Sequence, residues 1–197
     1  MPTKIGQVGV TFPDNTVQTT AAVAGAAGFG GFHNIQLITS TSFWICPTGV
    51  YKVMATVVGG GGGGWGGSAP NPTNGGPGGI AIGIYTVVPG TTYNITVGNG
   101  GTGVSGGSGG TSSFGAFCSA TGGRGGTNSG SGAAGNGSGG NLRNTYMHGG
   151  STGIMSGADF KEYSSPATPW SINSPFSPGA GTGTEDGGVG GAVMLEY

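Results

Sequence analysis

The chain has 197 residues, of which 51 are glycine, and only 6% are Asp, Glu, Lys or Arg, against about 25% in an average soluble domain. The net charge is −1 and the five basic residues are dispersed, which excludes the basic footprint of a nucleic-acid-binding protein. The glycines form blocks without a Gly-X-Y repeat, so the chain is not collagen-like. Runs of β-branched and aromatic residues, such as Phe43-Trp44-Ile45, argue against intrinsic disorder.

The first 32 residues differ in composition from the rest of the chain. Strand-like patterns flank the turn cluster Pro13-Asp14-Asn15, which predicts a hairpin too small to fold alone. An Ala- and Gly-rich link, residues 21–31, follows it. We recognise no signal peptide and no apolar span, so we expect synthesis in the cytoplasm and no membrane insertion. We therefore divide the chain into an N-terminal segment, residues 1–32, and a glycine-rich domain, residues 33–197.

The glycine-rich domain has the pattern of a β protein. No stretch shows the apolar stripe and the caps of a helix. The turn signal Pro89-Gly90 predicts that the apolar runs on either side of it form a hairpin. We expect an all-β domain of sandwich-like antiparallel strands with long glycine-rich loops. The predicted strands are residues 33–39, 42–46, 50–58, 80–88, 92–97, 113–120 and 192–197.

The glycines carry an energetic cost that the fold must offset. Glycine loses roughly 0.5–1 kcal/mol more conformational free energy than alanine in a regular element, and residues 59–157 contain 37 glycines. One remedy is polyglycine-II-like packing, in which extended runs bond to one another because no Cβ separates them. The other is association with further copies, which predicts a homotrimer with an unstable monomer. We also predict that alanine is tolerated at loop positions such as Gly132 and Gly137, but not within residues 59–64.

One interval lacks glycine altogether. Residues 158–178 carry four prolines and four aromatic residues, and together with the preceding stretch they form an irregular aromatic excursion, residues 141–178. Long segments without regular structure of their own are usually functional or disordered, and the aromatic residues argue against disorder. We expect this excursion to bind a partner.

Motifs for catalysis or metal binding are not recognisable in the sequence. Glycine stretches such as residues 122–127 lack the Gly-Lys-Ser/Thr ending and the following helix of a phosphate-binding loop. Asp159 and Glu162 could form the carboxylate pair of a glycosidase, but we interpret them as solvated charges of a loop. Neither histidine has the context of a catalytic triad. We therefore expect no enzyme, no cofactor and no metal, and for Cys46 and Cys118 we favour two buried thiols over one disulfide.

Several short motifs follow one another along the glycine-rich domain. They are Trp44 to Val50, Val57-Val58 leading into glycine, residues 85–93 around Pro89-Gly90, Gly98-Asn99-Gly100-Gly101, residues 110–115 and the closing residues 190–197. In this order they resemble the glycine-rich C-terminal domain of bacteriophage tail fibres. Residues 10–21 are similar to a motif often found before fibre tip domains. The resemblance covers most of the chain and departs from the pattern in residues 141–178, where the family more often continues in glycine.

The resemblance implies a function and a set of partners. Adhesins of this kind present host-specific loops from a glycine scaffold and attach the virion to a surface receptor. The chain would then be a tail fibre tip protein of the virion that binds a host-surface glycan or outer-membrane protein. Its N-terminal segment would join other tail fibre or baseplate proteins. The alternative is a purely structural tail fibre or baseplate component, which would have no need of an aromatic, glycine-free excursion.

The candidate receptor-binding residues are aromatic residues and one histidine. Trp65 interrupts a run of eight glycines, and it is either a packing anchor over glycine backbone or a platform for stacking on a sugar. The aromatic residues of the excursion are expected to divide between a small satellite core and exposed contacts, because aromatic residues dominate binding hot spots. We predict receptor contacts by Trp65, Tyr146, His148, Phe160, Tyr163, Trp170 and Phe176.

Overall fold

A computed structural model describes residues 4–6, 9–11, 17–18, 34–66, 73–146 and 187–197. The chain divides into two compact units, Met1–Phe32 and His33–Tyr197, at the boundary that the sequence analysis sets. In the first unit β1 (Lys4–Gly6), β2 (Gly9–Thr11) and β3 (Val17–Gln18) form one antiparallel sheet in the order β1-β2-β3. This sheet has one strand more than the predicted hairpin.

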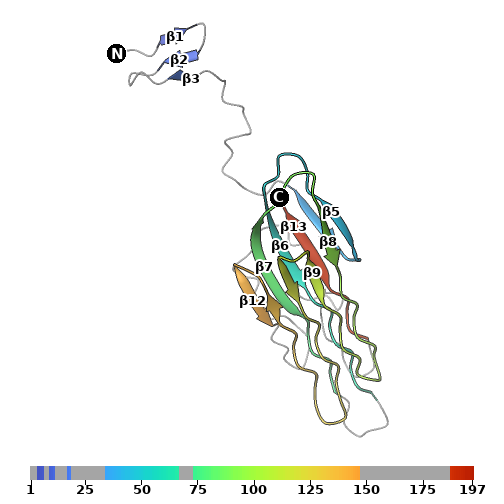
Figure 1. The fold of residues 1–197 in the computed structure, drawn as a ribbon. Helices are drawn as coiled ribbons and strands as arrows, with labels where there is room; N and C mark the ends of the chain where they lie inside the picture. Colours follow the sequence, from blue (N-terminus) through green and yellow to red (C-terminus); the bar gives the residue numbers. More distant parts are fainter. Residues whose placement is uncertain (1–3, 7–8, 12–16, 19–33, 67–72, 147–186) are drawn as a thin grey trace. The chain divides into compact units, whose positions relative to one another are not determined.

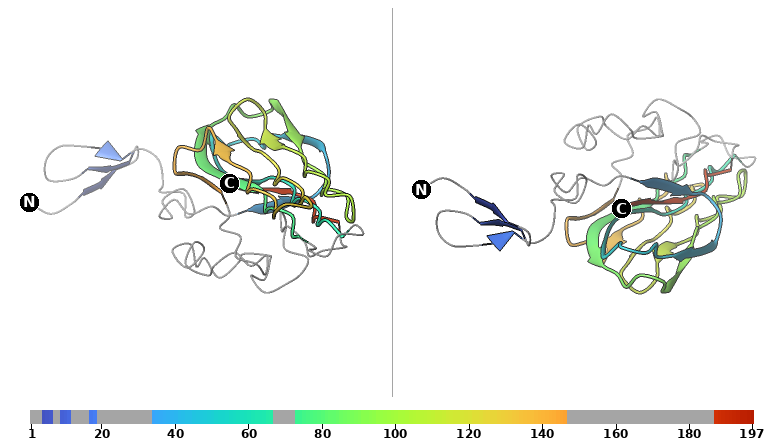
Figure 2. Two further views of the ribbon diagram at one scale, coloured as in Figure 1. Left: turned by 90° about the horizontal axis from the view of Figure 1, so that it is seen from below. Right: turned by 90° about the horizontal axis from the view of Figure 1, so that it is seen from above.

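The second unit is a sandwich of two antiparallel sheets (Figure 1). Its strands are β4 (Ile35–Ile38), β5 (Ser42–Ile45), β6 (Lys52–Val58), β7 (Gly79–Thr86), β8 (Thr92–Thr96), β9 (Ser112–Phe114), β10 (Cys118–Ala120), β11 (Gly137–Ser138), β12 (Arg143–Tyr146) and β13 (Ala192–Glu196). One sheet has the order β12-β7-β6-β13-β4 and the other β11-β10-β9-β8-β5. Figure 2 shows this unit from either end of the strands. No helix occurs in the described residues, and the all-β, sandwich-like prediction is confirmed.

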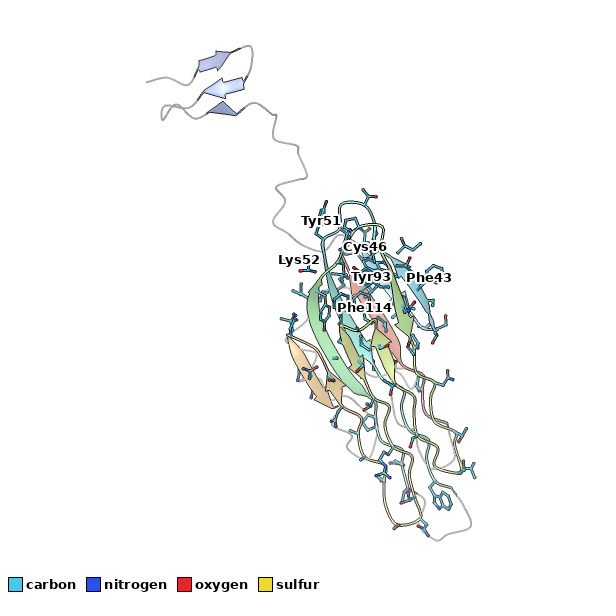
Figure 3. The ribbon with its side chains drawn as sticks, viewed as in Figure 1. Phe43, Cys46, Tyr51, Lys52, Tyr93 and Phe114 are labelled. Carbon is cyan, nitrogen blue, oxygen red and sulfur yellow. The ribbon has the colours of Figure 1, made fainter. Side chains whose placement is uncertain are left out.

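The main core lies between the two sheets. Alternate residues of β6, Val53, Ala55 and Val57, are completely buried there. Phe114 of β9 is equally buried. Its ring centroid lies 6.1 Å from that of Trp44 in the same sheet and 6.2 Å from that of Tyr85 in the opposite sheet. Figure 3 shows Phe114 inside the sandwich and Phe43 at its side. The alternation of β-branched and aromatic residues therefore builds a single aromatic-rich core.

The other face of β6 and β7 is also apolar. Met54, Val58, Ile80 and Ile82 form a second cluster in which no member is more than 9% exposed. A strand buried on both faces reads as a continuous apolar run rather than an alternating one. This accounts for the unbroken run Val53-Met54-Ala55-Thr56-Val57-Val58 that ends at the glycines.

The structure differs from two of the predictions about strands. Residues 113–120 contain two strands, β9 and β10, joined by a turn in which Gly115 has a φ of 50°. The predicted hairpin around Pro89-Gly90 is wrong, because β7 pairs with β6 and β12 whereas β8 pairs with β5 and β9. The turn instead bonds to the neighbouring connection, with Gly90 N donating to Cys46 O at 2.8 Å, and carries the chain from one sheet to the other.

Both cysteines are free and buried, which confirms the preference for thiols. Cys46 is 1% exposed and Cys118 is 4% exposed. Burial raises the pKa of each thiol above its ordinary value, because a thiolate loses hydration in an apolar surrounding.

We predict that neither thiol reacts with an aromatic disulfide reagent in the native protein at pH 8. Only the thiolate is nucleophilic, and here it is both disfavoured and shielded. Both thiols should react fully once the protein is unfolded in guanidinium chloride. A native-state reaction of even one thiol at the rate of a free cysteine would contradict the assigned burial.

Candidate functional site

Extended glycine-rich segments leave the sandwich at one end, where the strands stop (Figure 1). Each continues a strand or leads into one, and we call the whole set the glycine bundle. It consists of residues 59–64 after β6, 73–78 before β7, 97–101 after β8, 106–111 before β9, 121–126 after β10, 132–136 before β11 and 187–191 before β13.

Backbone hydrogen bonds join the segments with a period of three residues. Gly59 donates to Gly79, the first residue of β7, at 3.0 Å, and Gly62 donates to Gly76 of the segment before β7 at 2.8 Å. The residues between and after them bond to two other segments: Gly60 to Gly110 (2.9 Å), Gly63 to Gly107 (2.8 Å) and Gly61 to Val189 (2.8 Å). Three residues per turn with bonds in several directions is the geometry of a polyproline-II-type helix. The bundle therefore has the polyglycine-II-like packing that the sequence offers as one remedy for the cost of glycine.

Residues 59–64 lie at the centre of the glycine bundle. All six are buried, and their carbonyl groups accept hydrogen bonds from further segments, with Gly123, Gly101, Gly126 and Gly106 as donors. A Cβ added at Gly62 would overlap the carbonyl oxygen of Arg124, and one at Gly63 would overlap that of Thr102. Added Cβ atoms at Gly59 and Gly60 would overlap backbone carbonyl oxygens in the same way, so these four positions of the central segment accept only glycine.

The tolerance that we predict at Gly132 and Gly137 is contradicted by the structure. A Cβ at Gly132 would overlap the carbonyl oxygen of Arg124, and one at Gly137 would overlap that of Ile80. Both glycines belong to packed segments rather than loops. Gly130 is different, since a Cβ there meets nothing within 4 Å.

The turns at the far ends of the bundle segments meet one another. We call them the distal surface, which comprises Trp65, Gly66, Thr73, residues 102–105 and residues 127–130. Trp65 and Thr73 exchange two backbone hydrogen bonds of 2.8 and 3.0 Å, and Gly66 N donates to Val104 O at 3.1 Å. The Thr73 hydroxyl donates to the carbonyl of Thr127 at 2.7 Å. The described residues on either side of position 70 are thus held to residues 102–105 and 127–130 as one surface.

The distal surface is uncharged in its described part. Its exposed side chains are hydroxyls and one amide, from Thr102, Ser105, Thr127, Asn128 and Ser129, together with the aliphatic side chain of Val104. The charged residues described in this unit, Lys52, Arg124, Arg143 and Glu196, lie outside it. Figure 3 shows Lys52 and Tyr51 at the opposite end of the sandwich. Such a surface can donate and accept hydrogen bonds without long-range electrostatic attraction.

Among the predicted contact residues, Trp65 is the one whose side chain is described. It lies in the distal surface, half-buried, and its indole Nε1 is buried without a hydrogen-bond partner among the described residues. Tyr146 is the last residue of β12. The other predicted contacts, His148, Phe160, Tyr163, Trp170 and Phe176, lie outside the described residues, so these predictions stay untested.

The first residues of the 141–178 excursion belong to the sandwich. Residues 143–146 form β12 and pair with β7, and the Asn141 side chain bonds to both backbone groups of Ile84, at 2.9 and 2.7 Å. Residues 102–105 and 127–130 also belong to the site, although no motif in the sequence predicts it. Their signal is a short cluster of Thr, Ser, Asn or Val between glycine runs, but only the folded bundle brings the clusters together.

The described residues show no cluster of three or more His, Cys, Asp or Glu side chains that could hold a metal ion. Within the same residues, no helix has the length and hydropathy needed to cross a membrane.

Comparison with known proteins identifies one family. A family model described as a glycine-rich domain matches residues 36–194, a range that runs from β4 to β13 and includes every segment of the glycine bundle. No curated protein matches the sequence significantly.

Proposed function

We propose a function from the premise that the chain belongs to the family of glycine-rich domains. In this proposal the chain is a non-enzymatic phage tail fibre tip protein that binds a host cell-surface receptor during adsorption. The observation that carries it is the contrast between the packed glycine positions of the bundle, which leave no room for a side chain, and the distal surface, which displays side chains.

In this proposal the glycine bundle is the scaffold and the distal surface is the part that contacts the receptor. The bundle bonds backbone to backbone, so its shape does not depend on the side chains of the turns. Binding residues are commonly found on loops that a rigid scaffold positions. Because the described residues of the distal surface are already bonded to one another, little ordering remains to oppose binding. The receptor is then a host-surface glycan or outer-membrane protein that meets the distal surface.

The first unit supports the proposed partners. It spans residues 1–32 with strands of three, three and two residues, and units shorter than about 40 residues usually need association, a disulfide or a metal to be stable. We therefore keep the homotrimer as a proposal, placed at residues 1–32, together with attachment to other tail fibre or baseplate proteins of the virion. The described bundle bonds its backbone within one chain, so association is not needed for that purpose. Sedimentation showing a folded monomer at micromolar concentration would remove the trimer from the proposal.

A purely structural role is the second candidate. It is favoured by the continuous hydrogen bonding of the bundle, which suits a stiff spacer, and it gives no role to the exposed side chains of the distal surface. Receptor binding and a purely structural role are distinguished by adding the purified chain to host cells first and the virion that carries the chain afterwards. We expect a concentration-dependent block of adsorption. Unchanged adsorption at saturating protein would favour the structural role.

A further inference from the structure

We propose that Val104 is a receptor-contact residue and that the part of the distal surface around it binds a neutral glycan. This inference rests on the proposed function and names the chemistry of the receptor. It starts from the backbone of Val104, whose φ is 60°.

The conformation of Val104 is unfavourable for its side chain. In the left-handed region the Cβ crowds the following carbonyl, and a β-branched residue is a clear outlier there. The other described residues with such a φ are all glycine: Gly49, Gly90, Gly106, Gly115 and Gly139. In a chain with 51 glycines, valine at this position is the exception.

The fold gains little from the Val104 side chain. It is 52% exposed and belongs to neither apolar cluster. The Val104 carbonyl accepts a hydrogen bond from Gly66 N, and glycine at position 104 would accept the same bond equally well. Strain at an exposed position points to a role outside folding. Because the side chain lies on the distal surface, contact with the receptor is the role that fits.

The surroundings of Val104 indicate what it contacts. The hydroxyls of Thr102 and Ser105 lie on the same turn, 3.3 Å apart, and Asn128 and Ser129 are exposed on a neighbouring turn. Hydroxyl and amide groups around one branched aliphatic side chain match the hydroxyls and the C–H face of a sugar. Protein partners usually require several aromatic or Arg anchors, and the described distal surface has only the half-buried Trp65. None of the described residues of the distal surface is charged, so the surface itself has no group that selects an acidic sugar; the exposed Arg124 lies three residues before Thr127, in the bundle.

The experiment compares Val104→Gly with Gly90→Val in the full chain. Gly90 has a φ of 77° with nothing within 4 Å of an added Cβ, and it lies in a turn of the sandwich, so it calibrates the strain of valine without touching the distal surface. We expect Val104→Gly to raise the melting temperature by about 2–4 °C and Gly90→Val to lower it by about as much. Binding to the neutral polysaccharide fraction of the host surface should weaken at least tenfold in Val104→Gly and stay unchanged in Gly90→Val.

The outcomes separate this inference from the proposed function. Undiminished binding by Val104→Gly, or a lower melting temperature, would overturn the role of Val104. If the intact chain binds host cells and protease treatment of those cells abolishes binding while periodate does not, the receptor is a protein and the glycan assignment is wrong. If the intact chain binds no host-surface component, the proposed function fails as well.

Discussion

Replacing Gly62 by alanine should lower the free energy of unfolding by about 3 kcal/mol, which corresponds to about 6–12 °C in melting temperature. The added methyl group would overlap the carbonyl oxygen of Arg124, and that carbonyl accepts a hydrogen bond from Gly76 at 2.7 Å. Neither backbone can retreat without breaking bonds to a third segment. The penalty therefore arises from packed backbone, which cannot change rotamer to make room.

The matched control is Gly130→Ala. At Gly130 an added Cβ meets nothing within 4 Å, and we expect a change within about 0.5 kcal/mol, of either sign. Gly137→Ala should resemble Gly62→Ala, because its Cβ would overlap the carbonyl oxygen of Ile80. Urea unfolding of the three variants measures these differences. Equal midpoints for Gly62→Ala and Gly130→Ala would show that the bundle does not pack as described.

Replacing Phe114 by alanine should cost about 3–5 kcal/mol of stability. Phe114 is completely buried, and its ring contacts Trp44, Tyr85, Tyr93 and Phe117 with centroid separations of 5.3–6.2 Å. Its loss would leave a cavity between the sheets that rigid strands cannot close. Because residues 106–111 of the bundle lead directly into β9, we expect sandwich and bundle to unfold together.

Phe43→Ala is the control for this change. Phe43 lies on β5 and is 63% exposed, so we expect a loss within about 0.5 kcal/mol. Urea unfolding followed by fluorescence and by circular dichroism tests both statements. Two separate transitions in the unmodified protein would argue against cooperative unfolding, and a small effect of Phe114→Ala would argue against the assigned core.

The sequence predicts strands well where apolar and β-branched residues follow one another, as in residues 50–58, because burial between layers requires them. It does not predict which strands pair. The turn signal at Pro89-Gly90 is the same for a hairpin and for a crossing between sheets, and only the pairing of β7 and β8 with other strands distinguishes the two. The two-residue strand β11 is too short for any pattern to show.

The glycines mark the limit of sequence reasoning most clearly. Gly130 and Gly132 are two residues apart in similar surroundings along the chain, yet one faces open space and the other packs against a carbonyl. The neighbours that crowd Gly132 are Arg124 and Gly76, which lie 8 and 56 positions away along the chain, so no local pattern can report the difference. The candidate site also depends on contacts between segments that are distant in the sequence. Trp65 is visible in the sequence, whereas the meeting of the segments of the distal surface and the φ of Val104 exist only once the bundle has formed.

The central claim is that the distal surface, carried by the glycine bundle, binds the receptor. Its most direct test is competition with virion adsorption by two double variants of the full chain. One carries Asn128→Ala and Ser129→Ala on the distal surface. The other carries Tyr51→Ala and Val88→Ala at the opposite end, where Val87 N donates to Tyr51 O. All four residues are exposed, so both variants should keep the melting temperature of the parent. We predict that the distal variant loses at least tenfold in blocking potency and that the opposite-end variant blocks as the parent does. The account would be contradicted if the distal variant blocked adsorption as fully as the parent while the opposite-end variant lost blocking potency.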